Sequence, residues 1–276
     1  MSDDVTVVVT CFNYGAFLPE SVASALSQEG GEPHVIVVDD GSTDARTLAE
    51  LKRLPPQVEL IRQANAGLSA ARNTGLRRVQ TPYALALDAD DLLAPQALHR
   101  MRAPLQADAK LGFSYGIIRF FGDWEGDMRF PAYDPYRLLF RHNIGPSGLF
   151  RRKLFDDVGG YDPQFRGYED WEFWVHALEC GWHGTRVDHV THLYRRHGTT
   201  MYHGARAHYH ETFRLLRQKH HPLYTHAARG KLQAQSDLNA AGRLLYRWWW
   251  GARPLPARAE IALQSLLWRR ARRLHS

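Results

Sequence analysis

Four short runs rich in β-branched and aliphatic residues alternate with helix-like segments over the first 92 residues. The runs lie at 5–10, 34–39, 58–61 and 83–87. The segments between them, at 17–28, 42–51 and 66–79, have apolar residues at helical spacing or a Ser/Thr pair that can cap a helix. Because strands that alternate with helices pair in parallel, this order predicts an α/β fold with a doubly wound, mostly parallel sheet.

Polar side chains follow three of these runs, at the point where each predicted strand ends. They are Thr10 and Asn13 after the first run, Asp39 and Asp40 after the second, and Asp88, Asp90 and Asp91 after the fourth. Open α/β sheets bind ligands at the carboxyl ends of their strands. The sequence therefore predicts a single ligand site assembled from three strand ends.

Three carboxylates lie within the four residues from Asp88 to Asp91. Carboxylates this close repel each other unless they are solvated, protonated or joined by a cation, and their oxygens suit Mg²⁺ or Mn²⁺. Alternate residues of a strand face the same side, so Asp88 and Asp90 can face one ligand. A cation there would bind a diphosphate and stabilise it as a leaving group. The alternative is a solvated acidic turn in which Asp91 caps the next helix.

Charge is distributed unevenly over the 276 residues. The net charge is +6, yet residues 206–276 carry 14 Lys/Arg and three Asp/Glu, so the preceding body is mildly acidic. The start of the chain does not predict a signal peptide, and no run approaches the roughly 20 apolar residues of a spanning helix. Two cysteines fit neither a disulfide framework nor a zinc site, which favours a reducing compartment.

The pattern changes after residue 93. Residues 112–150 are rich in Gly, Phe, Tyr and Pro and predict short strands and loops. Residues 168–180 predict a helix with Trp171, Trp174 and Leu178 on one face. From about residue 205 the chain is expected to be helical and basic.

Five segments resemble the family 2 glycosyltransferases, which are inverting enzymes of the GT-A fold. They are VVVTCFNY at 7–14, VVDDGSTD at 37–44, NAGLSAARNTG at 65–75, LDADDL at 87–92 and GYEDW at 167–171. They follow the family's order and lie near its usual spacing, and the resemblance covers roughly residues 4–200. It implies a GT-A, Rossmann-like domain with a nucleotide-sugar half at 1–92 and an acceptor half at 93–205. The helical basic tail at 206–276 is not covered by the resemblance and is expected from its composition.

The resemblance also implies an activity. The chain would move a sugar from a nucleotide sugar, expected to be UDP-linked, to a hydroxyl of a glycan or lipid-linked saccharide. Mn²⁺ or Mg²⁺ would bind the diphosphate. We expect a cytoplasmic protein, peripheral on the inner face of the membrane if the tail binds lipid.

Individual roles follow from the resemblance in the same way. The nucleotide-sugar site would comprise Thr10, Phe12, Asn13, Asp39, Asp40, Arg72, Asp88 and Ala89. The metal would be held by Asp90 and Asp88, with His197 as an additional ligand. The catalytic pair would be Asp170, the general base, with Glu169, and the acceptor would meet Trp171, Tyr168 and Ser147. Arg195 and Arg196 are either neighbours of the phosphates or part of a solvated face.

The catalytic assignment agrees with the chemistry of an inverting transfer. One carboxylate must take the proton of the acceptor hydroxyl while the sugar carbon passes through an oxocarbenium-like state. Aromatic neighbours at Tyr168 and Trp171 would raise the pKa of Asp170 or stack on sugar rings. The competing interpretation is that Glu169 and Asp170 only favour the N-terminus of a helix through its dipole.

Trp and Arg lie together in the tail at 244–251 and 266–274. This composition suits an anionic membrane surface, and packing of the Trp side chains on the body remains open. We do not expect nucleic acid as a partner.

Three other functions compete with the transferase. A nicotinamide-dependent oxidoreductase is disfavoured because no G-x-G-x-x-G follows the first run. A processive polysaccharide synthase is disfavoured because spanning helices and a Q-x-x-R-W string are absent from the sequence. A catalytically idle nucleotide- or carbohydrate-binding module is the remaining alternative, and the presence of both Asp90 and Asp170 argues against it.

Overall fold

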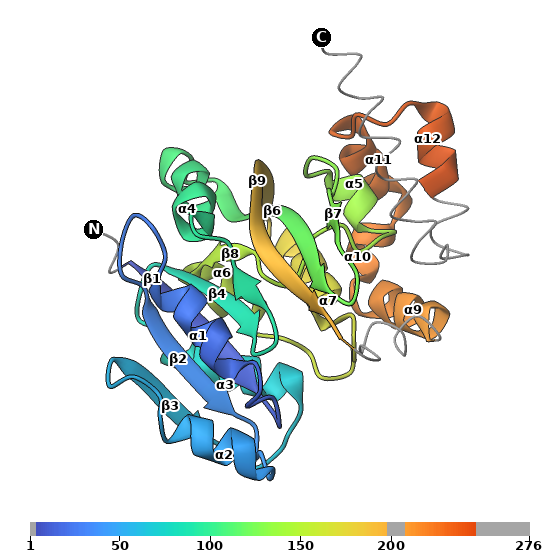
Figure 1. Ribbon diagram of the computed structural model, residues 1–276. Coiled ribbons are helices and arrows are strands. Elements are labelled where there is room, and N and C mark those ends of the chain that lie inside the picture. Colours follow the sequence, from blue (N-terminus) through green and yellow to red (C-terminus); the bar gives the residue numbers. More distant parts are fainter. Residues whose placement is uncertain (1–3, 198–207, 247–276) are drawn as a thin grey trace.

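One mixed sheet runs through the molecule in a computed structural model that describes residues 4–197 and 208–246. Its strand order is β3-β2-β1-β4-β8-β6-β9-β5, and β7 pairs with β6. Figure 1 shows the sheet twisting from β3 at one edge toward β6 and β9, with the C-terminal helices beyond the far side. The expected α/β fold with a mostly parallel sheet is confirmed.

The four expected strands form the parallel half of the sheet. They are β1 (Val5–Cys11), β2 (His34–Asp39), β3 (Val58–Arg62) and β4 (Tyr83–Asp88). All seven residues of β1 are buried, as expected for a central strand that is covered on both faces. The register pairs Thr10 with Asp88 and Cys11 with Asp39, so the polar strand ends meet at one edge as expected.

Three helices connect these strands. They are α1 (Leu18–Leu26), α2 (Ala45–Leu51) and α3 (Leu68–Arg78). The expected cap of α2 at residues 42 and 43 is wrong, because the helix starts later. Asp44 is the N-cap, and its Oδ1 accepts the N–H of Thr47 at 2.9 Å.

The second half of the sheet contains longer strands than the sequence indicated. β6 (Leu111–Gly122) and β9 (His183–Arg196) run parallel to each other. The expectation of short strands and loops over 112–150 is wrong for β6, which is largely buried on both faces and therefore shows no polar alternation. The rest of that range does contain short strands, and β9 lies outside it. The remaining strands are short: β5 (Leu92–Leu93), β7 (Gly126–Met128) and β8 (Leu149–Arg151).

Helices cover this half as well. They are α4 (Ala97–Ala107), α5 (Pro135–Leu138), α6 (Arg152–Val158) and α7 (Glu169–Glu179). Trp171 and Trp174 of α7 are fully buried in the core. The helix expected at 168–180 is confirmed.

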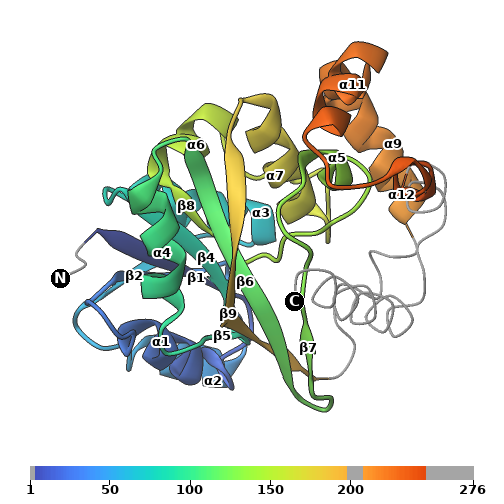
Figure 2. The ribbon, with the colours of Figure 1, turned by 90° about the horizontal axis from the view of Figure 1, so that it is seen from above.

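The C-terminal part is helical, as expected, over the residues that the structure describes. Its helices are α9 (Tyr209–Lys219), α10 (His221–Tyr224), α11 (His226–Ala234) and α12 (Ala240–Leu245). Figure 2 shows α9, α11 and α12 gathered beside α5 and α7, away from the parallel strands. No helix in the described ranges is long and apolar enough to cross a membrane. The tail segments expected to touch a membrane lie almost wholly outside the described residues.

The close approach of α3 to the sheet gives a stability prediction. A Cβ on Gly75 would lie 2.3 Å from Val8 Cγ1 and 2.9 Å from Val38 Cγ2. Gly75→Ala should therefore lower the free energy of unfolding by about 1–3 kcal/mol, because overpacking outweighs the better helix propensity of alanine. Urea denaturation followed by tryptophan fluorescence measures the change.

Gly230→Ala is the matched control. Gly230 also lies inside a helix, but a methyl group added there would meet no neighbouring side chain or backbone within 4 Å, so this variant should be neutral or slightly more stable. Equal stability of Gly75→Ala and the unmutated chain would show that α3 packs less tightly than described.

Candidate functional site

Asp88 ends β4 and contacts two of the predicted site residues. Arg72 Nη2 donates to its Oδ1 at 2.8 Å, and Thr10 Oγ1 donates to the same oxygen at 3.3 Å. The side chain remains 27% exposed, so the carboxylate is held on one side and open on the other. Asp88 is thus positioned to meet a ligand at the edge of the sheet.

Asp90 pairs with His197, the residue expected as an additional metal ligand. His197 Nε2 lies 2.9 Å from Asp90 Oδ2, although 107 residues separate them. The imidazole packs against Phe17 with 4.7 Å between ring centroids. Burial raises the pKa of Asp90 to about 6, with further contributions from Asp91 and Asp88. A cation bound at this position would stabilise the ionised form of the Asp90 carboxylate in place of the proton.

Asp91 has a structural role that differs from the helix cap considered above. Its Oδ2 lies 2.8 Å from His192 Nε2, and its Oδ1 accepts the backbone N–H of Arg195 at 2.9 Å. Burial raises the pKa of Asp91, and His192 opposes that shift. Asp91 therefore fastens β9 to the acidic segment and brings His197 to Asp90.

Arg195 completes this attachment rather than facing open solvent. Its Nη2 donates to Glu20 at 2.6 Å and its Nε to the carbonyl of Asp90 at 2.9 Å. The guanidinium lies 4.8 Å and 4.4 Å from the ring centroids of Phe17 and Phe121. Its Nε and Nη2 are thus engaged with the protein.

The donor set fits a divalent cation that also binds a phosphate. Among the residues that the structure describes, no group of three His, Cys, Asp or Glu is arranged to hold a metal. Asp90 and His197 supply two donors, with Asp88 at the adjoining strand end. Mg²⁺ is commonly held by one or two carboxylates, with the remaining positions filled by substrate phosphates and water. The residues therefore suit a metal that arrives with a diphosphate.

Asp39 and Asp40 organise the loops that surround the strand ends. Asp39 accepts the N–H of Ser42 at 3.0 Å and pairs with Arg62 at 2.9 Å. Asp40 accepts the N–H groups of Ala66 and Gly67, at 2.9 and 2.8 Å, and the side chain of Gln63 at 2.7 Å. A carboxylate offers about four lone-pair positions, so about one remains on Asp40 for a ligand.

Asn13 fixes the loop after β1. Its Oδ1 accepts the N–H groups of Thr43 and Asp44 at 2.8 and 3.1 Å, and its own N–H donates to Ser42 at 2.9 Å. Its φ of 56° is a conformation that asparagine adopts more readily than most residues. The side-chain carbonyl oxygen of Asn13 is therefore occupied by the loop rather than directed to a ligand.

Phe12 lies exposed at the end of β1. The residue is 42% exposed and follows the buried Thr10 by two positions. An exposed aromatic ring at the ligand-binding edge of an α/β sheet can stack on a nucleobase. Ala89, also expected here, is buried and donates its N–H to the carbonyl of Thr10 at 3.0 Å.

Arg72 connects the acidic segment to the second half of the molecule. Its Nη1 donates to Glu169 Oε1 at 3.1 Å, and its guanidinium lies 5.3 Å from the ring centroid of Tyr161. Burial disfavours the charged guanidinium, but Asp88 and Glu169 outweigh it and raise the pKa of Arg72. Burial raises the pKa of Glu169, and Arg72 opposes that shift.

Asp170 pairs with His142, which the sequence analysis missed. His142 Nε2 lies 3.0 Å from Asp170 Oδ2, and Asp170 Oδ1 accepts the N–H of Trp171 at 2.8 Å. The expectation of a raised pKa for Asp170 is wrong. Burial raises the pKa, but His142 and Arg72 outweigh burial and lower it. The one available signal was the Gly- and Pro-containing turn sequence that directly follows His142.

The three residues expected to contact the acceptor are all buried. Trp171 is fully buried, and its indole N–H donates to the carbonyl of Leu138 at 2.7 Å. Tyr168 is 3% exposed and packs edge-on against Trp171. Neither ring is available to stack on a sugar, because the aromatic spacing of this helix marks its core-facing side. Ser147 is also buried, at 5% exposure.

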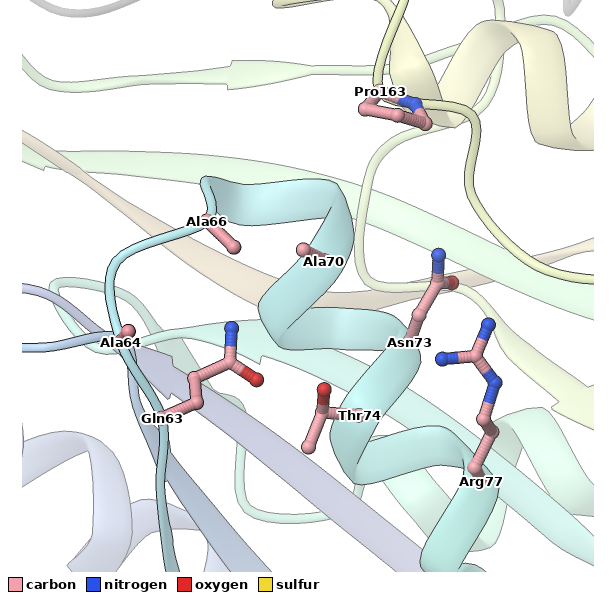
Figure 3. A pocket seen from close by; sticks show the side chains of 8 residues that line it. All are labelled: Gln63, Ala64, Ala66, Ala70, Asn73, Thr74, Arg77 and Pro163. Carbon is pink, nitrogen blue, oxygen red and sulfur yellow. The ribbon is translucent and has the colours of Figure 1, made fainter.

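A cavity of about 380 Å³ lies beside the loop that Asp40 holds. Figure 3 shows Gln63, Ala64 and Ala66 on the segment before α3, the side chains of that helix along one wall, and Pro163 opposite. The cavity shares Gln63 and Ala66 with the contacts of Asp40, but none of the acidic residues lines it. It therefore flanks the candidate site.

Comparison with known proteins identifies the family. The family model described as glycosyl transferase family 2 matches residues 6–170. The chain is 33% identical over 199 residues to the succinoglycan biosynthesis protein ExoO of Rhizobium meliloti, a match that covers 64% of this chain and 56% of that protein. It is 30% identical over 187 residues to the glycosyltransferase GlyA of Streptococcus pneumoniae, covering 66% of this chain and 24% of that protein. The chain thus spans only part of the relatives it matches.

Solved structures share the fold. Residues 1–349 of S. aureus TarS in complex with UDP-GlcNAc match with a TM-score of 0.66 at 18% identity, covering 88% of this chain and 70% of that one. The mannosyltransferase PcManGT from Pyrobaculum calidifontis, in complex with GDP-Man and Mn²⁺, matches with a TM-score of 0.58 at 22% identity, covering 96% and 80%. Both similarities support the GT-A fold.

The raised pKa of Asp90 gives a prediction about the metal-free protein. The unfolded chain loses this proton near pH 3.8 and the folded chain near pH 6, so the contribution of Asp90 to stability falls as pH rises between these values. Asp90→Asn keeps the shape and removes the charge. In EDTA at pH 7.5 it should raise the melting temperature by about 2–4 °C, and the gain should vanish at pH 4.

Asp188→Asn is the control, because this exposed carboxylate of β9 lies outside the acidic segment. It should leave the melting temperature unchanged at both pH values. A lower melting temperature for Asp90→Asn at pH 7.5 would contradict the claim that the ionised Asp90 destabilises the metal-free protein.

Proposed function

We propose that this chain, which belongs to glycosyl transferase family 2, is an inverting, metal-dependent glycosyltransferase that moves a sugar from a nucleotide sugar to a hydroxyl. The observation that carries the proposal is the pair of Asp90 and His197 at the edge where Thr10, Asp39 and Asp88 meet. A carboxylate and an imidazole with Asp88 beside them suit a cation that bridges to a diphosphate.

The donor would lie across the carboxyl ends of β1, β2 and β4. Phe12 would stack on the base, the remaining lone pair of Asp40 would accept from a base N–H, and Asp88 would meet the ribose or the metal. A UDP-sugar is the donor we favour, in keeping with the UDP-GlcNAc complex of the structural neighbour TarS. Because PcManGT was solved in complex with GDP-Man, a GDP-sugar should be tested in parallel.

Mn²⁺ or Mg²⁺ would be held by Asp90 and His197, with Asp88 at the adjoining strand end. When bound, the cation would neutralise the negative charge that develops on the departing diphosphate. Asp90 and His197 would orient the donor, and Arg72 would hold Asp88 in place from the buried side.

Asp170 would act as the general base. Its carboxylate would take the proton of the acceptor hydroxyl as the acceptor oxygen forms a bond to the anomeric carbon. The bond from that carbon to the diphosphate breaks at the same time, and the diphosphate leaves with the electron pair. Attack from the face opposite the leaving group inverts the configuration. Glu169 would support Asp170 indirectly by holding Arg72.

We propose a growing glycan or a lipid-linked saccharide as the acceptor. ExoO is named as a succinoglycan biosynthesis protein, which supports a role in polysaccharide assembly. The buried Cys11 and exposed Cys180 are both free thiols, which supports a cytoplasmic location. Peripheral attachment to an anionic membrane surface remains a proposal for the tail.

Donor hydrolysis separates this proposal from a catalytically idle binding module. The unmutated chain should release UDP slowly from a nucleotide sugar with Mn²⁺ present, with water as the acceptor. Asp170→Asn should lower that rate about 10²–10⁴-fold through loss of the base. Asp90→Ala should lower it about 100-fold or more through loss of a metal ligand. UDP release can be followed by a coupled assay.

Asp188→Asn again serves as the control and should keep the unmutated rate. If Asp170→Asn kept the unmutated rate of hydrolysis, Asp170 would not be the general base. Absence of hydrolysis in the unmutated chain, with intact binding of nucleotide sugar, would favour the idle module instead.

Phe12 offers a test of the nucleotide position alone. Phe12→Ala should weaken the binding of UDP with Mn²⁺ by about 1–3 kcal/mol, the usual contribution of an aromatic ring stacked on a base. Leu60→Ala is the matched control, since Leu60 is similarly exposed, at 38%, on β3. Isothermal titration calorimetry measures both affinities. Equal affinities of the two variants for UDP would show that the nucleobase does not stack on Phe12.

A further inference from the structure

Three consecutive backbone carbonyls just before His142 each accept a hydrogen bond from an aromatic side chain. These carbonyls end α5, where the last C=O groups of a helix lack partners within the helix. The donors are Trp171 Nε1 to Leu138 at 2.7 Å, Tyr224 Oη to Leu139 at 2.7 Å and Tyr209 Oη to Phe140 at 2.9 Å. Two of the three donors belong to the C-terminal helices α9 and α10.

The same helices pack on the residue that follows Asp170. The ring of Trp171 stacks on Tyr209, with 5.8 Å between centroids and 14° between planes. It also stacks on Phe213 at 6.0 Å and 5°. Helix α9 therefore contacts both segments that meet at Asp170: the segment leading to His142 and the first turn of α7.

A buried ionic contact fixes the far end of α9 to α7. His220 is 1% exposed, with Nε2 3.0 Å from Glu172 and Nδ1 2.5 Å from Glu179. Lys219 Nζ lies 2.8 Å from the same Glu172, which is fully buried. Because removing one partner of a buried ion pair is costly, the pairing holds α9 in one place on α7.

The carboxylate of Asp170 is surrounded by groups from four segments. His142 approaches its Oδ2, Arg72 of α3 and Tyr161 lie within electrostatic range, and Glu169 precedes it on α7. Among the described residues, His142 is the one ion-pair partner of this carboxylate. Its side chain is 19% exposed.

We propose that His142 is a positioning residue for Asp170, and that α9 and α10 set the place of His142 through the carbonyls of Leu139 and Phe140. The inference rests on the proposed function, in which Asp170 is the base. The C-terminal helices are then part of the catalytic half, although the family match ends at residue 170.

His142 would act on Asp170 in two ways. Its contact with Oδ2, together with the Trp171 N–H on Oδ1, fixes the plane of the carboxylate and leaves the second lone pairs for the acceptor hydroxyl. Its proximity also lowers the pKa of Asp170, which favours the ionised carboxylate, the form that accepts a proton. His142 takes no proton from the acceptor in this scheme.

Three variants test the proposal with hydrolysis of a nucleotide sugar and Mn²⁺. The probe is whichever of UDP-Glc, UDP-GlcNAc and GDP-Man the unmutated chain hydrolyses fastest. His142→Ala should lower kcat about 10–100-fold, as supporting contacts of site residues usually do, with little change in KM for the donor. His142→Gln should recover part of kcat, since its amide can still donate. Tyr209→Phe should lower kcat less than His142→Ala.

The controls are matched in chemistry. Tyr115→Phe removes a Tyr hydroxyl that donates to the carbonyl of Pro131 at 3.1 Å, away from Asp170. His99→Gln removes an exposed His of α4, outside the cluster that fixes α9. Both should keep the kcat of the unmutated chain.

The pH profile gives a signature that a purely structural role would not produce. His142 lowers the pKa of Asp170, so its removal should raise that pKa and move the acid limb of kcat to higher pH in both His142 variants. In Tyr209→Phe the limb should move little, because His142 remains.

The outcomes separate the two levels of the proposal. If Asp170→Asn abolishes hydrolysis while His142→Ala behaves like His99→Gln, the positioning role is overturned and the proposed function stands. If none of the three donors is hydrolysed, the proposed function fails and the inference fails with it. A double-mutant cycle of His142→Ala and Asp170→Asn, measured by urea denaturation, tests the contact without relying on activity. A coupling free energy of zero would contradict the contact.

Discussion

A single buried guanidinium joins the two halves of the molecule. Arg72, on α3 of the parallel half, is 2% exposed and binds Asp88 at the end of β4 and Glu169 at the start of α7. A buried charge is tolerated only when it is paired and hydrogen-bonded, so both carboxylates must stay where they are. The candidate base, next to Glu169, is thereby held at a constant place relative to the strand ends that would hold the donor.

The three carboxylates of the acidic segment differ in how well their buried negative charge is compensated. Among the described residues, Asp88 pairs with Arg72, Asp91 with His192, and Asp90 with the partly exposed His197, beside its two acidic neighbours. The pKa of Asp90 is raised to about 6, because burial and repulsion are not fully compensated. The position left with excess negative charge is the one where a divalent cation would be bound, which fits a site that is completed by a metal and a diphosphate.

The parallel half of the fold and the meeting of its strand ends could be predicted from the sequence, because apolar runs and the polar residues after them are local signals. The longer strands could not. β9 is largely polar and β6 is buried on both faces, so neither shows the alternation of a half-exposed strand. The spacing of Trp171 on α7 correctly indicated one apolar face, but it could not show that α9 covers that face.

The family resemblance indicated His197 beside Asp90, but other contacts between distant segments could not be predicted. Asp91 meets His192 across 101 residues, and Asp170 meets a loop that carries no charge pattern of its own. Asp39, Asp40 and Asn13 were identified as ligand contacts from their positions. Their oxygens are largely occupied by the loops that shape the site, which a strand-end pattern cannot distinguish from ligand binding.

Thermal stabilisation of the unmutated chain by UDP-GlcNAc, UDP-Glc and GDP-Man, with and without Mn²⁺, tests the central claim most directly. Binding to the folded state raises the melting temperature by mass action. The account predicts a rise for one nucleotide sugar, dependent on Mn²⁺ and lost in EDTA. Absence of any rise, or an equal rise without the metal, would contradict a site in which Asp90 and His197 hold the diphosphate through a cation.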